Sequence, residues 1–177
     1  RARMERREQR ARELGVPALG ETQVGTVYQL LALAMHTRDE GRVRELALAT
    51  ATAAVAELFP GESKKARHTG ARAFLEAESI GGGLINLRGG DSLSFWNLTF
   101  QEYLVAEYLF GTIEEDWQEL LTADRLFESE WREVVLLLGG LTRGSRRTKA
   151  LFEMVLAQAK VEDLSIQARS YGLSMAL

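Results

Sequence analysis

The chain has 177 residues, 46% of them hydrophobic and 27% charged, and its formal net charge is −3. This composition is typical of a folded globular protein and excludes a disordered chain, and the small net charge gives no global attraction to nucleic acid. The absence of cysteine excludes disulfides, thiol catalysis and metal sites built from thiolates. Apolar runs such as residues 134–141 are too short to span a membrane and no secretory signal is visible, so we expect a cytoplasmic protein without membrane contacts.

The first 20 residues form an Arg-rich segment that we assign to no domain. Residues 1–12 hold six Arg and two Glu, a pattern typical of a helix with a solvated face. Because the sequence starts with Arg1 and not with Met, we also expect the chain to be a piece of a longer protein.

Three helices are predicted between residues 21 and 79. After Gly20, apolar residues recur at the spacing i, i+3, i+4, i+7 and i+11, which places them on one face of a helix. A second helix is predicted over residues 39–59, before Pro60, and a third over residues 64–79. The residues expected to be buried are Val24, Val27, Tyr28, Leu31 and Met35 in the first helix, Val43, Leu46, Ala47, Thr50, Ala54 and Leu58 in the second, and Ala71, Phe74 and Leu75 in the third.

A two-stranded β-hairpin is predicted next. The glycines at 81–83 end the third helix and free the backbone for a sharp turn. Residues 84–88 and 92–98 have the composition of strands, and Gly89-Gly90-Asp91 between them suits the positive φ values of a tight turn. A lone hairpin is only marginally stable, so we expect another element to cover it.

The following helix is predicted to begin at Thr99, directly after the second strand. Thr99 and Glu102 form a capping-box pattern, in which the Thr99 hydroxyl accepts the Glu102 N–H and the Glu102 carboxylate accepts the Thr99 N–H. Leu98 and Tyr103 have the spacing of a hydrophobic staple. Residues 100–110 are almost wholly apolar, so we expect this helix to be enclosed on most sides.

Helical patterns continue after Gly111. Three helices with short joints are predicted, and the tail from Asp163 is predicted to form a fourth. This arrangement is typical of stacked helix pairs, so residues 112–177 are predicted to start a superhelical, HEAT-like repeat segment. Ser129 is the predicted cap of the middle helix. The expected core residues are Trp117, Leu120 and Leu121, then Trp131, Val134, Val135, Leu138 and Leu141, and finally Phe152, Val155, Leu156 and Ala159.

No catalytic or metal site is expected. The two histidines, His36 and His68, lie far apart in the sequence and have no clustered carboxylates near them. The glycines at 81–83 and 89–90 do not lie between a buried strand and a helix, so we interpret them as turns and not as phosphate-binding loops.

The stretch "FWNLTFQEYLVAEYL" at residues 95–109 resembles the signature F-x-H-x-[ST]-F-Q-E-[YF]-x-A-A, found at the end of the winged-helix domain in NACHT-type P-loop NTPases. These proteins are signal-transducing (STAND) ATPases that include animal NOD-like receptors and bacterial antiphage defence proteins. The resemblance extends more loosely over residues 22–141. The residues that match the signature are Phe95, Leu98, Thr99, Phe100, Gln101, Glu102, Tyr103, Leu104, Ala106 and Leu109.

This resemblance implies a mainly α-helical chain with a winged-helix module at residues 21–111, whose wing is a two-stranded hairpin. It also implies a regulatory role, in which the winged helix rearranges to relay nucleotide state and ligand sensing, in bacterial defence or stress signalling. The implied partners are a P-loop nucleotide-binding domain of the same parent chain, which would bind ATP or ADP with Mg, an unidentified protein ligand or effector, and a second copy of the parent on activation.

The chain departs from the family pattern in two ways. It holds no GxxxxGK[ST] motif and no apolar run ending in paired Asp, so we expect this piece not to be an enzyme and to bind no cofactor by itself. Asn97 stands where the family commonly has a His that reaches a bound ADP phosphate. The Asn97 amide can donate to a phosphate oxygen without adding charge; in the simpler interpretation it satisfies a nearby backbone group.

DNA binding is the alternative function, and a helical protein-interaction scaffold is a further one. In a winged helix that reads DNA, the helix before the wing enters the major groove. The acidic balance of the chain and the apolar helix after the wing argue against a free-standing DNA reader. The basic residues that would contact phosphates are Lys64, Lys65, Arg67, His68 and Arg72 on this helix and Arg88 on the wing.

Overall fold

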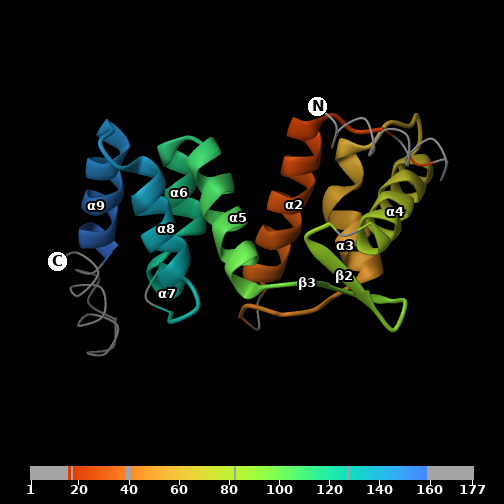
Figure 1. The fold of residues 1–177 in the computed structure, drawn as a ribbon. Helices are drawn as coiled ribbons and strands as arrows, with labels where there is room; N and C mark the ends of the chain where they lie inside the picture. Colours follow the sequence, from red (N-terminus) through yellow and green to blue (C-terminus); the bar gives the residue numbers. More distant parts are fainter. Residues whose placement is uncertain (1–15, 17, 39–40, 82, 127, 159–177) are drawn as a thin grey trace. The chain divides into compact units, whose positions relative to one another are not determined.

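The computed structural model describes residues 16, 18–38, 41–81, 83–126 and 128–158 of the chain (Figure 1). The described part is mainly helical with a small antiparallel sheet, and the chain divides into two compact units, Arg1–Gln101 and Glu102–Leu177. The elements in chain order are α2 (Glu21–His36), β1 (Leu46–Ala47), α3 (Leu48–Val55), a 3₁₀ turn (Ala56–Leu58), α4 (Lys64–Ile80), β2 (Ile85–Arg88), β3 (Ser92–Phe95), α5 (Leu98–Gly111), α6 (Glu114–Leu120), α7 (Ala123–Leu126), α8 (Arg132–Thr142) and α9 (Arg146–Gln158).

Helices α2 and α4 form where the apolar spacing predicts them. Every residue expected to be buried in these two helices is buried. Helix α4 starts after Ser63, whose hydroxyl accepts the Ala66 N–H at 3.1 Å and so satisfies one of the unpaired donors at the helix start. Helix α3 packs against both of them and lies between them in Figure 1.

The prediction of a second helix over residues 39–59 was wrong in its start and in its buried face. Residues 39–40 lie outside the described residues, Leu46 and Ala47 form strand β1, and α3 begins only at Leu48. Ala47 and Ala54, which we expected on the buried stripe, are exposed. A segment made mostly of alanine and threonine offers little apolar contrast between its faces, so its phase is set by tertiary packing. The buried residues of α3 are Leu48, Ala51, Thr52 and Val55.

The sheet has three strands in the order β1-β3-β2. Strands β2 and β3 are the predicted two-stranded wing, and β1 is an additional strand that was not predicted. Strand β3 pairs antiparallel with β2, with Ile85 opposite Phe95, and with β1, with Leu46 opposite Leu93. The hairpin turn is the predicted one, because Gly89 and Gly90 have φ values of 60° and 82°, which side chains disfavour. The second strand ends at Phe95 and not at Leu98.

A close backbone approach fixes the joint between α4 and the wing. The Tyr28 hydroxyl donates to a carboxylate oxygen of Glu78, and Gly83 N–H donates to the Glu78 carbonyl at 3.2 Å. A Cβ at Gly83 would lie 2.6 Å from the Tyr28 hydroxyl oxygen and 2.9 Å from the Glu78 carboxylate. A larger residue here would displace the ends of these two side chains, which gives Gly83 a packing role in addition to its backbone freedom.

The second unit contains the predicted helices after residue 111, with two corrections. Trp117, Trp131, Leu138 and Val155 are buried as expected, but Phe152 is 44% exposed because α9 buries Leu151 in its place. The cap predicted at Ser129 was wrong: residues 128–131 form a turn, and Trp131 is the residue before α8. The helix predicted from Asp163 lies outside the described residues.

Candidate functional site

The residues of the sequence signature lie at the junction between strand β3 and helix α5. Phe95 ends β3 and is buried, so the strand is held in the core up to its last residue. Two residues, Trp96 and Asn97, separate it from α5, and the Trp96 N–H still donates to the Leu84 carbonyl at 3.0 Å. The strand-to-helix connection is therefore short and hydrogen-bonded on the strand side.

Asn97 caps the start of α5, so the predicted capping box at Thr99 was wrong. The side-chain oxygen of Asn97 accepts the Thr99 N–H at 2.9 Å, and its carbonyl accepts the Phe100 N–H at 3.1 Å. The Thr99 N–H, which the box would pair with Glu102, is thus already used. Because the helix begins at Leu98, with Asn97 and not Thr99 before it, Leu98 is also no longer in the position of the hydrophobic staple.

Gln101 connects the first turn of α5 to the segment between α2 and β1. It is 1% exposed, and its side-chain nitrogen donates to the Val43 carbonyl at 3.3 Å. Val43 in turn donates its N–H to the Met35 carbonyl at 2.9 Å near the end of α2. The glutamine of the signature is thus a positioning residue for the first turn, a contact that no sequence pattern indicated because its acceptor is a backbone carbonyl.

Helix α5 carries an exposed aromatic stripe, so the expectation that it is enclosed on most sides was wrong. Phe100, Tyr103 and Phe110 are 43%, 40% and 38% exposed. The Tyr103 hydroxyl donates to Glu107 at 3.4 Å, and the negative charge of Glu107, together with partial burial, raises the pKa of Tyr103 above its ordinary value. The inner face of the helix is buried, including Leu104, Val105, Ala106 and Leu109.

The end of α5 is capped by a side chain from α6. The Leu109 carbonyl accepts the indole N–H of Trp117 at 2.7 Å, together with the Thr112 N–H at 3.1 Å and the Thr112 hydroxyl at 2.9 Å. Gly111 has no left-handed φ, so the usual glycine cap of a helix end is not formed. The last carbonyls of α5 depend on donors from outside the helix.

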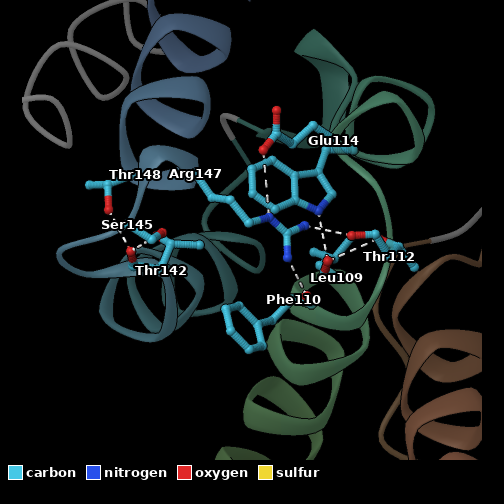
Figure 2. A network of polar contacts seen from close by, with 9 residues as sticks. Leu109, Phe110, Thr112, Glu114, Thr142, Ser145, Arg147 and Thr148 are labelled. Carbon is cyan, nitrogen blue, oxygen red and sulfur yellow. Dashed lines mark hydrogen bonds and ion pairs between the residues drawn. The ribbon is translucent and has the colours of Figure 1, made fainter.

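Arg147, near the start of α9, supplies the other donors (Figure 2). Its two terminal nitrogens donate to the carbonyls of Phe110 and Thr112, both at 2.5 Å. The guanidinium lies over the Trp117 ring, 4.6 Å from its centroid, and its Nε is 3.7 Å from a carboxylate oxygen of Glu114. One arginine thus makes two charge-assisted hydrogen bonds, an ion pair and cation–π contacts with both Trp117 and Phe110.

The turn between α8 and α9 positions Arg147. The Thr142 carbonyl accepts the hydroxyls of Ser145 and Thr148, both at 2.6 Å (Figure 2). Gly144 has a φ of 77°, which allows the chain to reverse between the two helices. Sequence reasoning missed Arg147 because a charged residue on an amphipathic helix is normally read as solvent-exposed.

The comparisons with known proteins agree with this geometry. Residues 2–109 match the family model described as "Winged helix-turn-helix domain C-terminal to NACHT". The chain belongs to this family. Neither the curated proteins nor the solved structures gave a match to the winged-helix chain.

In this winged-helix domain, the capping bond of Asn97 uses its side-chain oxygen and not the two N–H donors of its amide. This oxygen accepts the Thr99 N–H, which fixes the orientation of the amide, and the residue is exposed. The nitrogen suits a phosphate oxygen, but the group is neutral, so any charge compensation would come from elsewhere. The Asn97 side chain therefore satisfies a backbone group, as the simpler interpretation predicts.

Three of the six basic residues that would contact DNA are paired with carboxylates. Arg67 lies 3.2 Å from Glu57, and Arg72 lies 2.9 Å from Glu76. On the wing, Arg88 lies 3.0 Å from Glu45. Lys64 and Lys65 are exposed at the start of α4, and His68 is half-buried on the same helix. This pairing lowers the net positive charge available to a DNA backbone, since a phosphate would have to compete with these carboxylates.

Metal-ligating clusters and membrane-spanning helices are both absent from the described ranges. There, no group of three or more His, Cys, Asp or Glu residues is placed to hold a metal ion. Of the helices in the same ranges, none is long and apolar enough to cross a membrane.

Proposed function

We propose that the chain is the regulatory region of a NACHT-type signalling ATPase, in which the winged helix relays the nucleotide state of the NACHT domain. The match to winged helices that follow a NACHT domain is the observation that carries this proposal. It implies a NACHT domain as partner in the same parent chain. That domain, and not this region, would bind ATP or ADP with Mg and perform hydrolysis.

The β3–α5 junction is the element best suited to the relay. It holds the exposed Asn97 amide next to a first helical turn that is tied by Gln101 to the segment after α2. A contact between Asn97 and an ADP phosphate would favour one arrangement of the junction, and loss of that contact would favour another. In the parent protein this shift would connect nucleotide exchange to ligand sensing, with assembly of several copies on activation, in bacterial defence or stress signalling.

The test uses the parent chain with its NACHT domain, loaded with a fluorescent ADP analogue. Asn97→Asp keeps the oxygen that caps Thr99 but replaces the amide donor with a carboxylate, which repels phosphate. We expect the analogue to dissociate about tenfold faster, the change for one lost hydrogen bond to a charged group.

Thr69→Asp, which adds the same charge to an exposed position of α4, is the matched control and should leave the rate unchanged. Equal rates for Asn97→Asp and the wild type would overturn the role of Asn97. A parent chain that binds no nucleotide would overturn the proposed function as a whole.

A further inference from the structure

The end of helix α5 has a capping arrangement that the proposed function does not use. We call the side chains of Trp117 and Arg147, bound to the carbonyls of Leu109, Phe110 and Thr112, the distal cap. Trp117 on α6 lies 8 positions after its acceptor Leu109. Arg147 on α9 lies 37 positions after its acceptor Phe110. All of these residues belong to the second unit.

The two parts of the distal cap differ in their exposure to water. Trp117 is 1% exposed, so its bond to Leu109 is part of the core. The side chain of Arg147 is 25% exposed and that of its ion-pair partner Glu114 is 35% exposed. The outer part of the cap can therefore exchange its partners for water without opening the core.

A helix that ends in a glycine cap satisfies its last carbonyls from its own next residues. In helix α5, Gly111 lacks the left-handed conformation. The next residue, Thr112, serves the Leu109 carbonyl, whereas the Phe110 carbonyl accepts from Arg147. If Arg147 moves away, the Phe110 carbonyl in the last turn and the Thr112 carbonyl just after it each lose a charged donor, while the donors of Thr112 are already bound to the Leu109 carbonyl. Whether this turn stays helical then depends on whether the start of α9 remains docked against it.

We infer that the distal cap is a conformational coupling device: docking of the α9 start keeps the last turn of α5 closed, and its displacement opens that turn without unfolding the rest of the unit. Arg147 is the positioning residue of this device. The inference goes beyond the proposed function, since it concerns the opposite end of α5 from the Asn97 junction.

Hydrogen exchange of backbone amides in the 177-residue chain, measured by mass spectrometry, tests the inference. In Arg147→Met, which keeps the apolar stem, we expect the amides of residues 110–112 to exchange about tenfold faster, as for loss of a charge-assisted hydrogen bond. The amides of Val135 and Leu138 in α8 should change little, because they do not depend on the cap. Arg146→Met is the matched control, since Arg146 is the exposed neighbour in α9 and should leave all of these rates unchanged.

Arg147→Lys gives a second reading in a variant that keeps the charge. A single ammonium cannot span both carbonyls as the guanidinium fork does, so we expect an intermediate increase at residues 110–112. Unchanged exchange there in Arg147→Met, or an equal rise throughout α6, α8 and α9, would overturn the inference; the second result would make Arg147 an ordinary stabilising residue. Because no nucleotide is involved, this experiment can succeed or fail independently of the ADP measurement.

Discussion

Helix α5 is capped at its start by a residue next to it in the sequence, whereas its end receives donors from two other helices in addition to the adjacent Thr112. At the start, Asn97 accepts the N–H of a residue two positions later. At the end, the Phe110 carbonyl accepts from Arg147, 37 positions later. A local cap forms as soon as the helix forms, whereas a distant cap requires the surrounding unit to be folded. The two ends of one helix should therefore respond differently to mutation.

The largest effect is expected at the distal cap, where Trp117→Ala removes a fully buried ring. We expect the free energy of unfolding to fall by about 3–5 kcal/mol, from lost apolar burial and the cavity that remains. Trp117→Phe keeps most of the volume but removes the indole N–H that caps Leu109, and should cost about 1–2 kcal/mol. Urea unfolding followed by circular dichroism measures both. A Phe variant as stable as the wild type would show that the capping bond adds nothing to the packing of the ring.

A smaller effect is expected at the start of the helix. Asn97→Ala should lower the free energy of unfolding by about 1 kcal/mol, because the Thr99 N–H loses its acceptor. Asn97→Asp keeps the acceptor and places a negative charge at the positive end of the helix, so its stability should remain close to that of the wild type. The same urea experiment distinguishes them. If the two variants were equally destabilised, the side-chain oxygen would not be the cap.

The smallest effect concerns the middle of α5, where Tyr103 and Glu107 interact within the helix. Glu107→Gln removes the charge that repels the Tyr103 phenolate, so the pKa of Tyr103 should fall toward its ordinary value of 10.0. In the wild type, the folded protein holds this proton to higher pH than the unfolded chain. This contribution to stability is therefore complete below pH 10 and is lost as the pH rises through the raised pKa. An ultraviolet titration of the tyrosines, with Glu115→Gln as control, checks the shift; an unchanged titration curve would exclude Glu107 as its cause.

The elements that were predicted correctly have strong local signals. Helix α4 follows a capping serine and has a clear apolar stripe, and the hairpin contains two glycines whose positive φ values were expected from the sequence. The signature at the β3–α5 junction was also located correctly, although Asn97 and not Thr99 turned out to be the cap. Both residues are good capping residues, so sequence alone does not decide between neighbouring positions.

The elements that were missed depend on long-range contacts. Strand β1 has two residues and exists because Leu46 and Ala47 lie beside β3, which no local pattern encodes. Gln101 and Arg147 bind backbone carbonyls. Because every residue has a carbonyl, the sequence does not indicate which one a side chain will bind. The candidate site was therefore predictable as a motif, while the contacts that hold both ends of its helix were not.

The position of β3 in the middle of the sheet has a mechanical consequence. Tension applied along α5 would reach β3 through only two intervening residues and would load its hydrogen bonds to β1 and β2 in shear, since antiparallel bonds run across the strand direction. Many bonds would then have to break together, whereas the turns of a stretched helix can give way one by one. Under load, the wing would serve as the anchor and the helix as the element that yields first.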